Sequence, residues 1–152
     1  MGRVKELSHL IDRTVTGPMW HGPALLEVLD GVTPERAAAR PVAGAHSIWE
    51  IVLHAAAWAE IARARMKGTR LGDPTPEEDW PPVRATGAED WKRAVAQLRA
   101  SYRDLAADVK LLDEARLDET IATLTYRVSV LLHGVVEHGT YHGGQIALLK
   151  RA

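Results

Sequence analysis

The chain has 152 residues, of which 46% are hydrophobic and 26% charged, and its formal net charge is −1 at pH 7. A chain of this length buries one good core, and no apolar run approaches the roughly 18 residues of a membrane span, so we expect a single soluble domain over residues 1–152. The absence of cysteine excludes disulfides and thiolate ligands, and the dispersed basic residues argue against nucleic acid as a partner.

The N-terminal third predicts one interrupted helix. Apolar residues between Leu7 and Val15 recur at helical spacing, and Gly17-Pro18 breaks or kinks the helix before the segment PALLEVLDG. The segment TPER, beginning at Thr33, predicts a short helical turn with threonine as its cap. The first residues, MGRVKELSHLIDR, lack the apolar stretch and cleavage site of a secretory signal, so the expected location is the cytoplasm.

A second helix begins at SIWE, where Ser47 and Glu50 form a capping box, and its pattern continues to about Lys67. The connection that follows, residues 68–86, is longer than an antiparallel hairpin needs and can cross a bundle about 30 Å long, so the helices on either side of it are expected to be parallel. TPEE, at Thr75, predicts another short helical turn in this loop, and EDWPPV is a candidate lid over the mouth of the bundle.

Two further helices complete the pattern. Thr86 and Glu89 form a second capping box, after which apolar residues recur at helical spacing as far as Leu105. The last helix is expected from about Thr125 to Lys150. Four amphipathic helices without a strand pattern predict an all-α four-helix bundle.

Three histidines are predicted to face the interior at one level. His138 and His142 lie about 40° apart in the apolar stripe of the last helix. His54 lies in the apolar stripe of the second helix, roughly 10 Å from its start, while His142 lies roughly 12 Å from the chain's helical end. A histidine pair at this spacing is more often two core side chains that a neighbour satisfies, but three buried imidazoles at one level would all be satisfied by one divalent metal ion.

Other residues could support such a site. Gln145 lies within about 60° of both histidines of its helix and could contact a metal-bound water or the substrate, although a hydrogen bond at the edge of the core is the plainer interpretation. Glu50 could orient the imidazole of His54, but its capping box already explains it. Trp58 and Trp80 are expected to serve packing more than recognition, and His133 is expected on the surface or at a subunit contact.

The C-terminal helix also contains Gly139, Gly143 and Gly144. Each glycine in a helix interior costs about 1 kcal/mol relative to alanine, so three of them require a reason. Close approach of a neighbouring helix and room for a metal ion and substrate are both possible reasons.

These segments resemble a known family. SIWEIVLHAAAW, followed far downstream by LLHGVVEHGTYHGGQIALLKR, is similar to the DinB/YfiT-like superfamily of metal-dependent enzymes, and WHGPALLEVLDGVTPERAAARP is similar to its first helix and turn. The resemblance implies an up-down-down-up bundle, a divalent metal ion held by three histidines, and frequent dimerisation. The ligands would be His54, His138 and His142, and a homodimer is expected.

Three histidines without a fourth protein ligand leave an open position on the metal, which is typical of catalytic sites. Zinc or nickel is the first expectation for the ion, with iron or manganese as further candidates. The first functional hypothesis is a hydrolase of an unidentified small molecule, acting through metal-bound water. Relatives in the resembled superfamily include thiol-dependent transferases, so an S-transferase with the same ligands is an alternative, and a non-catalytic metal-binding or sensing module is another. The sequence identifies no catalytic side chain apart from the ligands.

Overall fold

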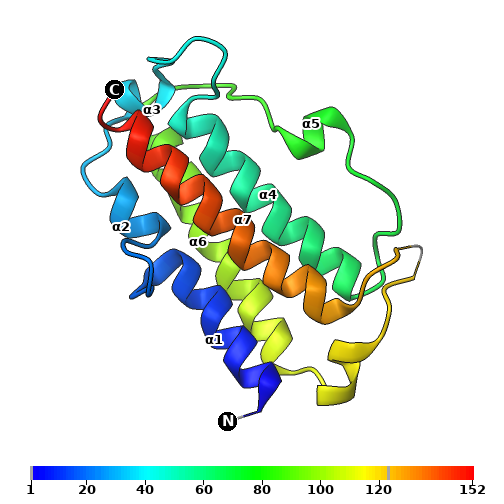
Figure 1. Cartoon of the computed structure of the whole chain (residues 1–152). Helices are drawn as coiled ribbons and strands as arrows, with labels where there is room; N and C mark the ends of the chain where they lie inside the picture. Colours follow the sequence, from blue (N-terminus) through cyan, green and yellow to red (C-terminus); the bar gives the residue numbers. More distant parts are fainter. Residues whose placement is uncertain (1, 123) are drawn as a thin grey trace.

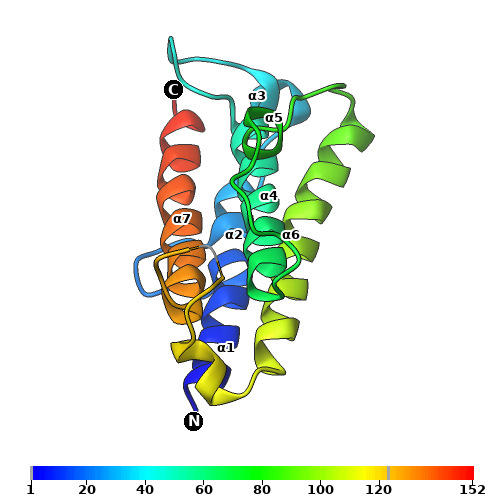
Figure 2. The same ribbon diagram turned by 90° about the vertical axis from the view of Figure 1, so that its right-hand side faces the viewer.

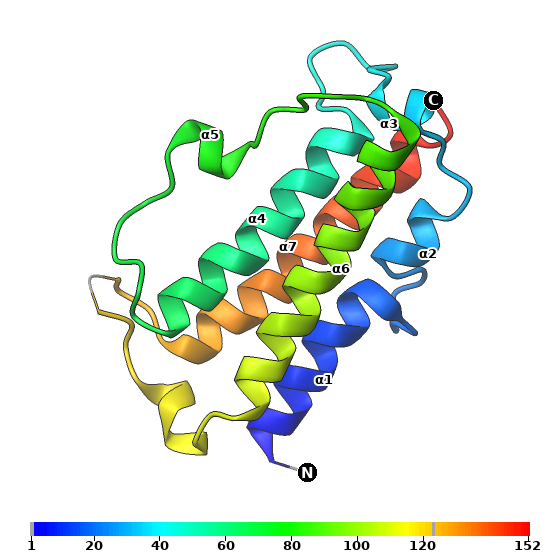
Figure 3. The same cartoon turned by 180° about the vertical axis from the view of Figure 1, so that it is seen from behind.

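Four long helices form the body of the protein in a computed structural model that describes residues 2–122 and 124–152 (Figure 1). The helices α1 and α7 run in one direction and α4 and α6 in the other, which confirms the predicted up-down-down-up bundle (Figure 3). In chain order the elements are α1 (Arg3–Thr16), α2 (Leu25–Leu29), α3 (Pro34–Ala38), α4 (Ile48–Met66), α5 (Pro76–Asp79), α6 (Ala88–Lys110), the 3₁₀ helix η1 (Glu114–Asp118) and α7 (Val128–Leu149).

The four long helices share one hydrophobic core. Helix α4 packs against α6 and α7, and α1 packs against the same two helices, so each long helix has two long neighbours. Because α4 and α7 are antiparallel neighbours, the first half of α4 lies beside the second half of α7 (Figure 1). No helix in the described ranges is long and apolar enough to cross a membrane.

The connection between α4 and α6 returns along the length of α4. Residues 67–87 carry α5 across the outer side of that helix, as Figure 2 shows, and this path makes α4 and α6 parallel as predicted. Thr75 and Glu78 form a capping box around α5. The buried guanidinium of Arg65 ties the loop to α4, because its Nη2 donates to Asp73 Oδ1 at 3.1 Å. The loop therefore brings the end of α5 over the first half of α4.

The N-terminal helix is interrupted where the sequence predicts. Helix α1 ends at Thr16 and is capped by Gly17, whose φ of +75° is a conformation that glycine adopts readily. The following bond to Pro18 is cis. The chain resumes as α2 after a short loop. The predicted turn at Thr33 is α3, in which the threonine hydroxyl accepts a hydrogen bond from the backbone N–H of Arg36 at 3.3 Å.

Helix α6 is capped one residue later than predicted. Its N-cap is Gly87 instead of Thr86, and the carboxylate of Asp90 accepts a hydrogen bond from the Gly87 N–H at 3.1 Å. Glu89, which the sequence assigned to the capping box, instead forms an ion pair with Lys92 at 2.7 Å. Since glycine has no side-chain oxygen, only one half of a capping box forms here.

Helix α7 starts at Val128 and not at about Thr125. Just before α7 the chain instead forms an isolated antiparallel bridge between Thr120 and Arg127. The N–H of Ile121 donates to the carbonyl of Tyr126 at 3.2 Å, and the N–H of Val128 donates to the carbonyl of Glu119 at 3.0 Å. These hydrogen bonds between neighbouring stretches of the chain compete with the first turn of the predicted helix.

Close helix packing explains one of the α7 glycines. A Cβ atom at Gly139 would lie 2.6 Å from Thr14 Cγ2 and 2.8 Å from the hydroxyl oxygen of Tyr102. Gly139 therefore makes room on α7 for the side chains of Thr14 from α1 and Tyr102 from α6. A Cβ at Gly143 would make an ordinary contact of 3.6 Å with Leu25, and one at Gly144 would meet open space.

Candidate metal centre

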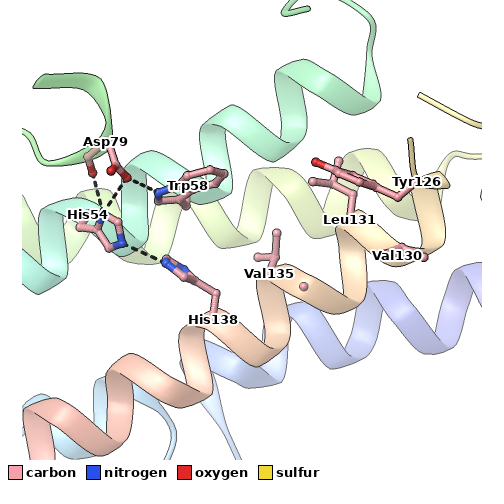
Figure 4. Close-up of a pocket in the computed structure, with 9 residues that line it drawn as sticks. His54, Trp58, Asp79, Tyr126, Val130, Leu131, Val135 and His138 are labelled. Carbon is pink, nitrogen blue, oxygen red and sulfur yellow. Dashed lines mark hydrogen bonds and ion pairs between the residues drawn. The ribbon is translucent and has the colours of Figure 1, made fainter. Parts of the chain in front are cut away.

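Three imidazoles converge where α4 faces α7. The Nε2 atom of His138 lies 2.9 Å from Nε2 of His54 and 3.0 Å from Nε2 of His142. One ring nitrogen from each residue lies within 4.8 Å of the other two, and His54 and His142 are buried while His138 is half-buried. Figure 4 shows His54 pointing from α4 toward His138 on α7. The predicted convergence of the three histidines is confirmed.

The ring of His54 is oriented by the loop that carries α5. Its Nδ1 atom lies 2.6 Å from the backbone carbonyl oxygen of Asp79 and 3.3 Å from Oδ1 of the same residue. A carbonyl oxygen can only accept, so Nδ1 carries the proton and Nε2 presents a lone pair. The indole of Trp58 donates to Asp79 Oδ1 at 2.6 Å, and the indole of Trp80 stacks on His54 with centroids 3.8 Å apart. Figure 4 shows His54, Asp79 and Trp58 joined by these hydrogen bonds, and together with the stacking of Trp80 they hold the ring in place.

The ring of His142 is oriented from within its own helix. Gln145 Oε1 lies 2.6 Å from His142 Nδ1, while Gln145 Nε2 donates to the hydroxyl of Tyr141 at 3.0 Å. The amide oxygen therefore accepts a hydrogen bond from Nδ1, and the Nε2 lone pair of His142 also faces the centre of the cluster. Of the two sequence interpretations of Gln145, the structure shows the hydrogen bond at the edge of the core.

The His138 ring cannot donate a hydrogen bond to both His54 and His142. Its Nε2 faces two lone pairs, and a single hydrogen there could be donated to only one of them. Its Nδ1 is buried and has no hydrogen-bond partner among residues 2–122 and 124–152. A divalent cation would accept all three Nε2 lone pairs, and tetrahedral ligands at 2.0–2.1 Å from zinc lie about 3.3 Å apart, which is close to the observed spacing. The three residues therefore fit a metal ion.

Burial keeps these imidazoles neutral. Desolvation, together with the charges that His142 and His54 would carry, lowers the pKa of His138 to about 3. Burial also lowers the pKa of His54 and of His142, against the opposing effects of the hydrogen bonds that their Nδ1–H groups donate to Asp79 and Gln145 respectively. Neutral imidazole is the form that binds metal, so the site is prepared for a cation at neutral pH.

Glu50 and His133 lie outside the cluster. The Glu50 carboxylate accepts a hydrogen bond from the Ser47 backbone N–H at 2.7 Å and forms an ion pair with Arg40, so it caps α4. The described contacts of Glu50 are those of the helix cap, while the Nδ1 atom of His54 contacts Asp79. His133 is exposed on α7, as expected from its helical position.

Two cavities reach the histidine cluster from different sides. One, of about 430 Å³, lies between α4 and α7 and is lined by His54 and His138 (Figure 4). The other, also about 430 Å³, is lined by His142 and by His46, whose ring stacks on Trp80 with centroids 3.5 Å apart. Trp80 also stacks on His54, so its indole lies between the rings of His46 and His54 at the side of the cluster.

Sequence reasoning missed Asp79 and underrated Trp80. The only signal for either was the segment EDWPPV, interpreted as a candidate lid over the bundle. Asp79 acts mainly through its backbone carbonyl, a group that every residue has, so its identity could not indicate the role. Trp58 is more than a packing residue, because its indole N–H fixes the Asp79 carboxylate.

Residues 20–146, which include all three histidines, match the family model described as the DinB superfamily. The chain belongs to the DinB superfamily. No curated protein and no solved structure matches it significantly. Within this DinB-superfamily bundle, the three buried histidines could bind a metal ion whose identity is open.

Proposed function

We propose that the protein is a metal-dependent enzyme whose ion is held by His54, His138 and His142. The observation that carries this proposal is the convergence of three Nε2 atoms, two of them in rings whose Nδ1 protons are engaged by Asp79 and Gln145. Fixed Nδ1 partners of this kind are the usual outer-shell companions of metal-binding histidines. The described residues add no fourth histidine or carboxylate to the cluster, which supports an open coordination position.

Hydrolysis is the reaction that this site supports best. A divalent ion with an open position would lower the pKa of a bound water toward about 7 and polarise a substrate carbonyl. The protein would supply neutral imidazole ligands, a fixed orientation for His54 and His142, and a cavity for the substrate. The Asp79 carboxylate contacts the Nδ1 side of the His54 ring, opposite to Nε2, so its role is to position that ring and not to act as a base at the ion.

The two cavities favour a second candidate, an S-transferase. A hydrolase needs one organic substrate, whereas a thiol-dependent transferase must bring a thiol and an electrophile to one metal ion. The cavity at His138 and the cavity at His142 provide separate approaches to the same cluster. The resemblance to families that include thiol-dependent transferases also supports this candidate.

Metal analysis followed by activity assays tests the proposal. Protein purified without an affinity tag is analysed for bound metal, then stripped and reloaded with zinc or nickel. The loaded protein is assayed with neutral p-nitrophenyl esters, and with small thiols and a chlorodinitrobenzene electrophile. We expect one ion per chain in the parent and in His133→Ala, and none in His138→Ala. Bound metal without either activity would favour the non-catalytic module, and full metal binding by His138→Ala would refute the site.

We also propose that the protein forms a homodimer. The family resemblance supports this assembly, and three large apolar side chains are exposed along α7, namely Val130, Tyr141 and Leu148. Light scattering at micromolar concentration would test it, and a monomer there would refute the dimer without affecting the metal centre.

A further inference from the structure

The cavity beside His54 and His138 has walls made mainly of carbon. Trp58 on α4 and Leu131 and Val135 on α7 line it, and Figure 4 shows it extending from the histidines toward Tyr126 at the far end. Its volume of about 430 Å³ falls in the range of small-molecule sites, which is 300–1,000 Å³. It is continuous with the proposed metal centre because two of the histidines are part of its wall.

Apart from the histidines, the polar side chains in this wall already have hydrogen-bond partners. The indole N–H of Trp58 donates to Asp79, and the hydroxyl oxygen of Tyr126 accepts from Arg65 Nη1 at 3.3 Å. The residues that line the cavity include no lysine or arginine, and Asp79 supplies their only carboxylate. An anionic group would therefore meet no cationic side chain in the wall, and the nearby guanidinium of Arg65 is already paired with Asp73. An uncharged apolar group would lose nothing by entering.

A glycine on the cavity wall has no packing explanation. Gly134 lies one helical turn before His138, so it shares the face of α7 that borders the cavity. A Cβ atom there would meet no atom within 4 Å, in contrast to Gly139, whose Cβ would clash with two helices. Since glycine inside a helix costs about 1 kcal/mol relative to alanine, its presence at a cavity wall is explained if the space is used by a ligand.

We infer that this cavity binds an uncharged, apolar acyl or aryl group of the substrate, whose polar head lies at the histidine cluster. The inference rests on the proposed metal centre and names the substrate class of the same site. Gly134 determines the size of the group by leaving the middle of the cavity open.

Alkyl hydroxamic acids of increasing chain length test this inference, because the hydroxamate binds a metal ion and the alkyl chain reports the surroundings. Their affinities for the zinc-loaded protein are measured by calorimetry. Each added methylene is expected to raise affinity by up to about fourfold, which corresponds to about 0.8 kcal/mol per buried methylene, until the cavity is full. A chain ending in a carboxylate should bind at least about tenfold more weakly than the neutral chain of equal length.

Two glycine variants locate the chain. Gly134→Leu fills the cavity and should abolish the gain with length, while leaving zinc and acetohydroxamate binding unchanged. Gly144→Leu is the matched control, because it adds the same side chain to the same helix at an exposed position, and it should keep the full gain.

The outcomes separate this inference from the metal proposal. Affinity that does not depend on chain length would overturn the apolar substrate class and leave the metal centre standing. If affinity still rises with alkyl chain length in Gly134→Leu, the apolar group does not bind in this cavity. Failure of the parent to bind zinc would overturn the metal centre and this inference with it.

Discussion

Acid should destabilise the metal-free protein through its buried histidines. The pKa of His138 is about 3 in the folded protein, against about 6.5 in an unfolded chain. The folded state therefore binds fewer protons than the unfolded state between these two values, so the stability from this residue is complete above about pH 6.5 and is lost as pH falls toward about 3. The lowered pKa values of His54 and His142 act in the same direction.

The size of the effect follows from the His138 shift. One pKa unit corresponds to about 1.36 kcal/mol, and protonation of this residue in the unfolded chain alone removes about 2 kcal/mol between about pH 7.5 and about pH 5. That is a large part of the 5–15 kcal/mol by which small domains are usually stable. His138→Ala should lower stability at every pH by leaving a cavity, but its loss between these two pH values should be smaller than the parent's by about 2 kcal/mol.

Urea unfolding in the presence of EDTA measures this dependence. The free energy of unfolding is determined at several pH values between about 5 and about 7.5 for the parent, His138→Ala and the exposed control His133→Ala, which should keep the parental dependence. With stoichiometric zinc in place of EDTA, the parent should lose stability more steeply as pH falls, because protons then compete with the metal for the imidazoles. If His138→Ala loses as much stability as the parent over this pH range, burial does not keep the His138 ring neutral in the parent.

Three further results are expected. Gly139→Ala should lower the free energy of unfolding by about 1–3 kcal/mol, since the added Cβ would overlap Thr14 and Tyr102, whereas Gly144→Ala should raise it by about 1 kcal/mol; equal effects in urea unfolding would contradict the packing argument. Gln145→Leu removes the acceptor for His142 Nδ1 and should weaken zinc binding about 10- to 100-fold in a chelator competition, and unchanged affinity would show that the hydrogen bond does not tune the ligand. Removing zinc with EDTA should lower the melting temperature of the parent but not of His138→Ala, and an equal shift in both would place the ion elsewhere.

The sequence by itself predicted the main helices and the face on which each histidine lies. This was possible because every helical residue advances about 100°, so spacing alone places His138 and His142 on one inner face and His54 on another. Their common level followed from helix rise and antiparallel packing. The sequence allowed two interpretations of the glycines, close helix packing or room for a metal ion and substrate. At Gly139 the contacts with Thr14 and Tyr102 show close packing.

Only the tertiary structure decided how the cluster is supported and what surrounds it. The carbonyl of Asp79 reaches His54 across 25 positions in the chain, and the late start of α7 depends on backbone pairing with residues near 120. The open space beside Gly134 depends on where α4 lies relative to α7. The Asp79 contact and the open space arise where distant segments meet, and the pairing before α7 arises between two short neighbouring segments. Helical spacing contains no information about these features, because backbone groups and empty volume have no residue type of their own.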